Sequence, residues 1–527
     1  MMAGLAVAAL LAACSSTSKT STGGGSTTAG STGGTDKPLL IARGMDFMSL
    51  DPSRAYCDTC QIYLTAIYET LIGLAPDNKT LEPRLALSWT GNADQTQFTF
   101  KLDPKAKFAD GSQVTSADVK FSWERLGGLK GSASYLVGQI KSIDTPDPET
   151  VVANMTTSNS AFLAQVNASY LGIINSKVAQ AQGATIDPAT DKAEPWFLKN
   201  SAGSGPFTLE SYTQGTEIRF KRNDAYWGTK AAFPEVVIKE TPTAVTQRQQ
   251  LEAGTVDLAM QISTDVAKDM KSSSVTVTKV PSYNYVYLAL SPGVKGGEKL
   301  TPDVLKAIKL ALDYKGLIDV TVGGAGQPQP SPIPNGFLGT DGLTPPSQDV
   351  AAARALLTKA GVTGLSLDAT YPTFNVYGVD FTTAMQKVQS DLKAVGIDIK
   401  LNPVAPTVWF DKISKDGIPV TMLYFAPDHT DPSQYVQYFG LLPASNWQGW
   451  TKAPANANEV TLLTKALGTK DEAARGAVYK QLAQAMIDDG VIIPVVNPDL
   501  YLASRSNIKG NHYSACCNLV LSRLSRG

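Results

Sequence analysis

Histidine and cysteine are scarce in this chain of 527 residues, which has two His and five Cys. With so few nitrogen and sulfur ligands, we expect no transition-metal site and no cofactor. A secreted hydrolase would need a nucleophile with a base, yet neither His429 nor His512 lies in a G-x-S-x-G or H-E-x-x-H setting. The scarcity therefore favours a protein that is not an enzyme.

The chain also lacks an excess of charge of either sign, because its 46 Lys and Arg are balanced by 47 Asp and Glu. The balance gives no reason to expect nucleic acid as a partner. Beyond residue 35 no apolar stretch reaches the roughly 20 residues that a membrane-spanning helix needs. The glycines at 203 and 205 match neither GxGxxG nor GxxxxGK[ST], so they predict a turn rather than a phosphate site.

The amino terminus carries the strongest single motif. A short apolar run over residues 5–11 leads into Leu11-Ala12-Ala13-Cys14. This pattern resembles the lipobox of bacterial lipoproteins, although no Lys or Arg precedes the run. The resemblance implies a signal peptide over 1–13, cleavage before Cys14 and a diacylglyceryl group on its sulfur. We expect a lipid-anchored protein on the extracytoplasmic face of the cell membrane.

Residues 14–37 continue from that cysteine as a tract of Ser, Thr and Gly. Such a tract cannot bury apolar surface and behaves as a flexible tether. The long remainder of the chain predicts two or three lobes rather than one core.

Four further cysteines fall into two pairs. Cys57 and Cys60 form C-x-x-C, whereas Cys516 and Cys517 are adjacent near the carboxyl end. An even number of cysteines outside the cytoplasm favours disulfides. We expect the two pairs to bridge each other and to pin the tail to the first lobe; a local Cys57–Cys60 bridge is the alternative.

Apolar periodicity predicts alternating strands and helices, which is typical of α/β lobes. Thr115 and Asp118 form a capping box in its Asp-accepting version and predict a helix start. Strands are expected at 39–42, 98–102, 208–210, 217–221, 285–290 and 397–401, and helices at 63–72, 302–318, 349–360 and 383–395.

Several segments occur in the order of one known family. They are residues 66–72, 81–89, 98–123, 203–207, 222–228, 248–257, 285–289, 307–318 and 428–432. Together they resemble the extracellular solute-binding proteins of ABC importers, the family with oligopeptide-, dipeptide- and nickel-binding members. The resemblance implies a monomeric, periplasmic-binding-protein-like clamshell of two mixed-sheet α/β lobes. It would capture a peptide or similar small solute and deliver it to the permease subunits.

The same resemblance suggests how the chain divides. Lobe 1 would span 38–280 with an extra subdomain at about 55–200, lobe 2 would span 281–490, and the tail at 491–527 would return to lobe 1.

A candidate ligand site lies at 420–432, where an apolar strand runs into an acidic loop. Loops at strand ends are where α/β proteins place binding groups. In peptide-binding relatives an aspartate just before the Asp-Pro dipeptide holds the ligand's ammonium group, and Asp428 matches it. His429 follows it in the same loop. Aromatic side chains would supply an apolar wall, with Phe425 and Trp409 preferred over Tyr424, Tyr285 and Trp447.

One departure from the dipeptide-binding pattern leaves the ligand open. Such relatives place an arginine for the ligand carboxylate where this chain has Thr382 and Thr383. Longer peptides, opines, sugars or metal chelates are therefore alternatives to a dipeptide, and a secreted hydrolase is a more remote one.

Overall fold

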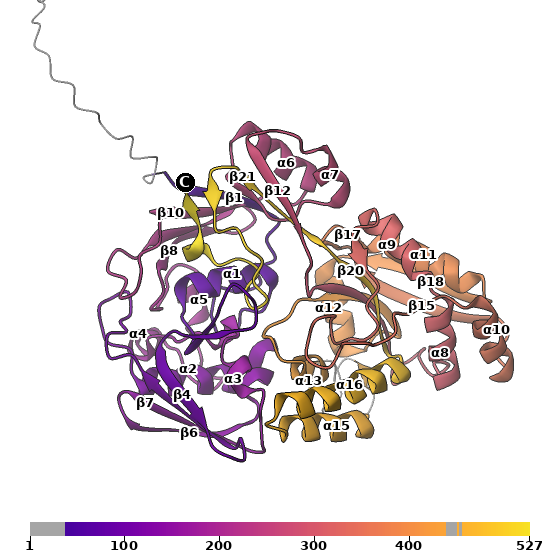
Figure 1. Ribbon diagram of the computed structural model, residues 1–527, viewed down its shortest axis with the longest axis horizontal. Helices are drawn as coiled ribbons and strands as arrows, with labels where there is room; N and C mark the ends of the chain where they lie inside the picture. The colour runs from indigo at the N-terminus through magenta and orange to yellow at the C-terminus, as the bar shows by residue number, and fades with distance from the viewer. Residues whose placement is uncertain (1–36, 439–450, 453–455) are drawn as a thin grey trace, which may run out of the picture.

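The computed structural model describes residues 37–438, 451–452 and 456–527. Two lobes lie side by side, each built on its own mixed sheet (Figure 1). We call the part before strand β13 (Tyr285–Leu290) and after strand β20 (Ile492–Pro498) lobe 1, and the part from β13 to β20 lobe 2. Among the helices in these ranges, none is long and apolar enough to cross a bilayer. The signal, Cys14 and the tether lie outside the described residues.

The main sheet of lobe 1 has seven strands, with β1 at its centre between parallel neighbours β10 and β11. Ile41 and Ala42 of β1 (Leu39–Arg43) point to opposite faces and are both fully buried, as befits a strand covered on both faces. In spatial order the strands are β12 (Val275–Val280), β21 (Leu500–Arg505), β11 (Leu258–Ala259), β1 (Leu39–Arg43), β10 (Glu235–Glu240), β9 (Glu217–Arg222) and β8 (Phe207–Thr213).

Lobe 1 also contains a four-stranded antiparallel sheet, in the order β4 (Ala86–Gly91), β5 (Gln97–Leu102), β7 (Thr150–Met155) and β6 (Ile140–Asp147). Phe98 and Phe100 of β5 point inward and pack on Phe162. Helix α2 (Ser116–Gly128) begins at the predicted capping box, with the Thr115 N–H donating to Asp118 at 2.9 Å. The predicted helix start is confirmed.

Lobe 2 is built on six strands, in the order β14 (Gly326–Gln327), β20 (Ile492–Pro498), β13 (Tyr285–Leu290), β19 (Val420–Phe425), β15 (Leu365–Pro372) and β18 (Ile397–Val404). The two faces of β13 enter different cores. Val286 and Leu288 join the core of α8 (Pro302–Ala311), α9 (Tyr314–Val322), α10 (Val350–Lys359) and α11 (Phe381–Lys393). Tyr285 and Tyr287 join that of α12 (Pro406–Lys415), α15 (Ala457–Leu467) and α16 (Glu472–Asp489).

Two expected helices have different bounds in the structure. Helix α1 is Asp58–Ile67, because Cys57 caps its first turn, and residues 72–74 form strand β2 (Ile72–Leu74) instead of its end. The single helix expected at 302–318 is divided into α8 and α9. The carboxylate of Asp313 accepts the Gly316 N–H at 2.9 Å and so starts a new helix.

The chain crosses between the lobes twice. It passes from β12 to β13 and returns from β20 to β21. After β21 the tail folds back along α1 and ends in a short ribbon of β22 (Ile508–Lys509) with β23 (Ser525–Arg526) (Figure 1). The tail therefore lies against lobe 1, close to the segment that connects β1 to α1.

Two motifs that are distant in the sequence meet in lobe 1. The buried Glu69 accepts hydrogen bonds from the Tyr226 hydroxyl at 2.6 Å and the Trp227 indole N–H at 2.9 Å. Gly203 lies against the end of α1, where an added Cβ would stand 2.0 Å from the Ile67 carbonyl oxygen. Glycine at position 203 allows the close approach of the two backbones, and the buried Glu69 carboxylate explains the presence of Tyr226 and Trp227.

Replacing Glu69 by Ala should lower the free energy of unfolding by about 1–3 kcal/mol, because Tyr226 and Trp227 lose their shared acceptor. Urea unfolding measures the loss. The matched control is Glu124→Ala on α2, where an exposed pair with Lys120 is broken; it should change stability by less than about 1 kcal/mol. Equal stability of the two variants would contradict the assigned role of Glu69.

Candidate functional site

Asp428 lies in the loop that follows β19, and only 2% of its surface is exposed. Its Oδ2 accepts hydrogen bonds from the hydroxyls of Tyr56, at 3.0 Å, and Tyr135. Its Oδ1 accepts a weaker one from Gln61 Nε2 at 3.4 Å. All three donors belong to lobe 1, so the carboxylate of Asp428 joins the two lobes.

The rest of the loop holds Asp428 in place. Gln434 accepts the Asp428 N–H at 2.7 Å and donates to the carbonyls of His429 and Asp431. The carboxylate of Asp431 accepts the Ser433 N–H at 2.9 Å and the Tyr479 hydroxyl at 2.6 Å. The Asp-Pro dipeptide thus organises the loop and the start of α13 (Ser433–Tyr438).

Burial dominates the electrostatics of this loop. It raises the pKa of Asp428 to about 7, although the hydroxyls of Tyr135 and Tyr56 act in the opposite direction. In the described part of the chain, no Lys, Arg or His forms an ion pair with this carboxylate. Burial also lowers the pKa of His429 to about 4, so its imidazole is neutral at pH 7. Nδ1 of His429 accepts the Asp431 N–H at 3.1 Å, which leaves the proton on Nε2.

Two of the predicted aromatic residues pack together near Asp428. Phe425 and Tyr285 occupy facing positions on β19 and β13, with ring centroids 6.5 Å apart. Tyr435 completes the group, 5.2 Å from Phe425. Tyr424 points to the opposite face of β19 and meets Tyr377 edge-on at 5.7 Å. The structure therefore brings Tyr285 and Phe425 together and separates Tyr424 from them.

Trp409 packs in the same lobe 2 core as Phe425. Its indole N–H donates to Thr421 Oγ1 at 2.9 Å, near the beginning of β19. Phe425 lies four residues beyond Thr421 in the strand, so the Cα atoms of these two residues are roughly 13 Å apart. Trp409 is 95% buried in the lobe 2 core. Trp447 lies outside the described residues.

The first turn of α1 provides a second contact between the lobes. The hydroxyl of Tyr377 in lobe 2 donates to Asp58 Oδ2 at 2.6 Å. Tyr377 stands at the tip of the hairpin of β16 (Asn375–Val376) and β17 (Val379–Asp380). In lobe 1 the Asp58 carboxylate also lies 3.6 Å from the Arg43 guanidinium. Burial raises the pKa of Asp58, while Arg43 opposes the shift.

A third contact between the lobes lies further along the interface. Arg475 on α16 donates to the Ser160 carbonyl at 2.9 Å, and the Ser160 N–H and hydroxyl both donate to the Leu467 carbonyl at 2.8 Å.

Sequence reasoning missed Tyr56, Asp58, Gln61 and Tyr135. The three-residue spacing of Asp58 and Gln61 places both on one face of α1, but nothing local indicates that this face meets lobe 2.

The predicted bridge between the two cysteine pairs is wrong, because each pair closes on itself. Cys57 caps α1 and Cys60 lies in its first turn, with Cα atoms 4.9 Å apart, within the usual range for a disulfide. The local alternative for this pair is therefore confirmed. The tail still reaches α1 through Asn518, whose Nδ2 donates to Gln61 Oε1 at 2.9 Å.

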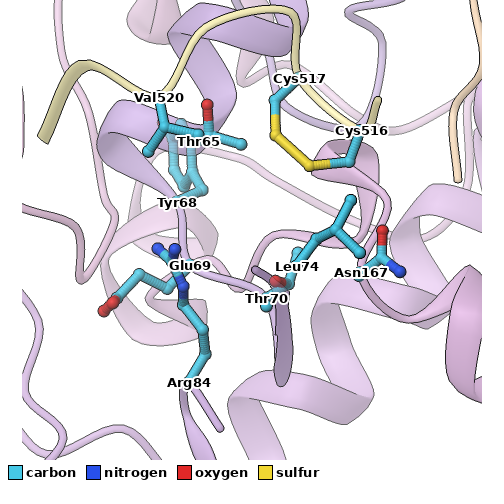
Figure 2. Close-up of a pocket in the computed structure, with 11 residues that line it drawn as sticks. Thr65, Tyr68, Glu69, Thr70, Leu74, Arg84, Asn167, Cys516, Cys517 and Val520 are labelled. Carbon is cyan, nitrogen blue, oxygen red and sulfur yellow. A yellow bond between two sulfur atoms is a disulfide. The ribbon is translucent and has the colours of Figure 1, made fainter. Parts of the chain in front are cut away.

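A pocket opens where the tail meets the end of α1 (Figure 2). The Cys516–Cys517 disulfide forms one wall and Arg84 points in from below. The lining residues are Thr65, Tyr68, Glu69, Thr70, Gly73, Leu74, Arg84, Asn167, Cys516, Cys517 and Val520. All of them belong to lobe 1 or the tail, so this pocket is separate from the contacts of Asp428.

Comparisons with known proteins place this geometry in a family. The chain is 29% identical over 479 residues to the probable D,D-dipeptide-binding periplasmic protein DdpA of Escherichia coli (strain K12), covering 90% of each chain. The fold matches the dipeptide binding protein of Pseudoalteromonas sp. SM9913 in complex with Met-Leu, with a TM-score of 0.82, 20% identity and coverage of 93% of this chain and 100% of the other.

A second solved structure, the PBP AgaA from A.tumefacien R10 in complex with agropinic acid, matches with a TM-score of 0.81 and 23% identity, covering 93% of this chain and 99% of that one. The two-lobed α/β fold expected from the sequence is thereby confirmed. The family model for bacterial extracellular solute-binding proteins, family 5 Middle, matches residues 80–447. The chain therefore belongs to the bacterial extracellular solute-binding proteins of family 5.

Proposed function

We propose that this protein captures a peptide or similar amine-bearing solute between its lobes and that Asp428 binds the solute's ammonium group. The observation that carries the proposal is a buried carboxylate at the lobe interface with no cationic partner among the described residues. A buried carboxylate is stabilised best by a positive charge that donates hydrogen bonds. An ammonium group supplies both.

Ligand binding and lobe closure would be linked through this residue. The ammonium group would replace hydroxyl donors from lobe 1 at Asp428, while the rest of the solute contacts lobe 1. A solute that touches both lobes stabilises the closed arrangement by its higher affinity for it. The permease subunits of an ABC importer would then receive the solute from the closed form. Members of this family bind solutes for transport, and we propose no catalytic activity for this protein.

Two observations bear on the class of solute. The relatives named above bind dipeptides or agropinic acid according to their descriptions, and each of these solutes is small and polar. Thr382 and Thr383 stand where dipeptide-binding relatives place an arginine. A peptide is our first proposal. An amine-bearing opine is the second, because the arginine is missing.

We propose Phe425 and Tyr285 as an apolar wall. They are paired at the end of β19 from which the chain continues to Asp428. Tyr424 would act through Tyr377 at the hairpin tip. His429 is neutral and buried, so we propose that it shapes the loop rather than pairs with a charge.

We further propose that the protein is held at the extracytoplasmic face of the membrane by a lipid on Cys14. The apolar run, the small residues before the cysteine and the Ser/Thr/Gly tract after it support this anchor. The tether would let the two lobes reach the permease while the lipid remains in the bilayer.

Replacing Asp428 by Asn should weaken binding of D-alanyl-D-alanine or L-methionyl-L-leucine at least about tenfold, because an amide is a weaker acceptor for an ammonium group. Isothermal titration calorimetry measures the affinity. The control is Asp411→Asn, since Asp411 is an exposed residue paired with Lys415 on α12. Unchanged affinity of the Asp428 variant for a peptide that the parent protein binds would refute the ammonium role.

Closure of the ligand-free protein should depend on pH. Closing buries Asp428 and raises its pKa from 3.8 to about 7, so the closed form binds more protons between these values. Closure is then favoured at low pH and weakens as the pH rises through 7. Small-angle X-ray scattering should show a larger radius of gyration at pH 8.5 than at pH 5. The Asp428→Asn variant should show a smaller change; an equal change would contradict this account.

Substitution of Cys14 by Ser should abolish lipid attachment, which metabolic labelling with a radioactive fatty acid detects. The control is the Cys57→Ser/Cys60→Ser double variant, which should keep the label. Label retained on the Cys14 variant would place the anchor elsewhere.

A further inference from the structure

Ser160 of lobe 1 directs each of its three polar groups to lobe 2. It lies in the loop between β7 and helix α3 (Phe162–Gln165). Its N–H and its hydroxyl both donate to the Leu467 carbonyl at 2.8 Å. Its own carbonyl accepts a hydrogen bond from Arg475 Nη1 at 2.9 Å. One residue of lobe 1 is thus held by hydrogen bonds to two residues of lobe 2.

Leu467 is the last residue of helix α15, and this position explains why its carbonyl needs a donor from elsewhere. The last four carbonyl groups of an α-helix have no partner within the helix. The N–H groups that follow Leu467 donate to earlier carbonyls, those of Thr464 and Ala466. The negative end of the helix dipole also favours a donor here. Ser160 supplies two donors, so separation of the lobes would leave this carbonyl to water.

The residues next to Ser160 add further contacts with lobe 2. Ala161 is fully buried and belongs to the lobe 2 core cluster that contains Leu467. The buried Gln165 donates through Nε2 to Gln437 Oε1 on α13 at 3.3 Å. The contact therefore combines burial of an apolar side chain with hydrogen bonds, and both are lost when the lobes move apart.

Arg475 connects this contact to the loop of Asp428. It lies on α16, and 85% of its side chain is buried. Nη1 donates to the Ser160 carbonyl, whereas Nη2 lies 3.9 Å from Asp431 Oδ2. Among the residues that the structure describes, Arg475 makes its one hydrogen bond to Ser160. A buried guanidinium needs acceptors, so Arg475 favours the arrangement in which lobe 1 supplies one.

We propose that Ser160, Arg475 and the Leu467 carbonyl form a latch that sets how readily the lobes close and thereby how tightly the protein binds its solute. All hydrogen bonds of the latch join protein groups, so it stabilises the closed arrangement with or without a solute. The apparent affinity of a solute that requires the closed form rises with the closed fraction of the ligand-free protein.

The latch goes beyond the proposed function, because it does not select the solute. Asp428 would favour solutes with an ammonium group, whereas the latch would raise the affinity for every solute that requires closure. Ser160 and Arg475 are therefore positioning residues, which act on binding through the arrangement of the lobes. A change in the latch should alter the affinities of different solutes by the same factor.

Two substitutions weaken the latch from opposite lobes. Ser160→Ala removes the hydroxyl that donates to Leu467, and Arg475→Gln removes the guanidinium that donates to Ser160. Each should lower the equilibrium constant for closing about two- to tenfold, and the double variant should lower it further. Small-angle X-ray scattering at pH 5 should show a larger radius of gyration for the ligand-free double variant than for the parent protein. Calorimetry should show weaker binding of D-alanyl-D-alanine and L-methionyl-L-leucine by a similar factor.

Two control variants break the same kinds of hydrogen bond within a single lobe. Thr156→Ala matches Ser160→Ala, because the Thr156 N–H and hydroxyl both donate to the Gln139 carbonyl inside lobe 1. Arg354→Gln matches Arg475→Gln, because Arg354 donates to the Ala394 carbonyl inside lobe 2. Both controls should keep the parent's radius of gyration and affinities. Thermal unfolding of every variant checks that the fold is retained.

The two measurements decide the proposal together. A larger radius of gyration, or an equal loss of affinity for the two peptides, supports the latch. An unchanged radius with unchanged affinities would overturn it, and so would a loss of affinity for one peptide alone, since that result indicates direct contact with the solute. The scattering comparison needs no solute. If the parent protein binds neither peptide, the proposed solute class is wrong, and equal radii would then overturn the latch separately.

Discussion

A carboxylate that loses contact with water must be protonated, hydrogen-bonded or paired with a cation, and Asp428 meets this constraint with groups from the opposite lobe. Tyr56, Tyr135 and Gln61 donate to it across the interface. The contact between the two lobes therefore depends on the Asp428 carboxylate, whose hydrogen bonds from lobe 1 could be replaced by water, a proton or a ligand. A solute that competes for this carboxylate would therefore shift the equilibrium between arrangements of the lobes.

The scaffold positions these groups by burying everything around them. Strand β19 carries Asp428 to the interface from a core in which both faces of β13 are covered. On the other side, the Cys57–Cys60 bridge closes the turn that contains Asp58, and Asn518 of the tail holds the Gln61 amide. Because Asn518 donates to Gln61 Oε1, the Nε2 of Gln61 must face lobe 2. A residue near the carboxyl end thus fixes which atom of α1 meets Asp428.

Features that depend on neighbouring residues could be predicted from the sequence. The capping box at Thr115 and the strand at 285–290 depend on local hydrogen bonding and periodicity, and both are confirmed. The start of α1 and the division at Asp313 were missed because a cap outweighed the apolar pattern. Resemblance to a family indicated Asp428. Tyr56 and Tyr135 could not be found, since their contacts with Asp428 of lobe 2 are a property of the fold. The disulfide prediction failed because the sequence spacing of the cysteines does not determine which of them pair.

We propose that Asp428, a buried carboxylate with no counterion in the described part of the chain, binds a positively charged group of the solute. Native mass spectrometry of the protein purified from its own host tests it most directly, because the carried-over solute can be released and identified. We predict a small solute with an amine, present in the parent protein and depleted in the Asp428→Asn variant. A neutral sugar or a purely anionic solute, retained equally by both proteins, would contradict the claim.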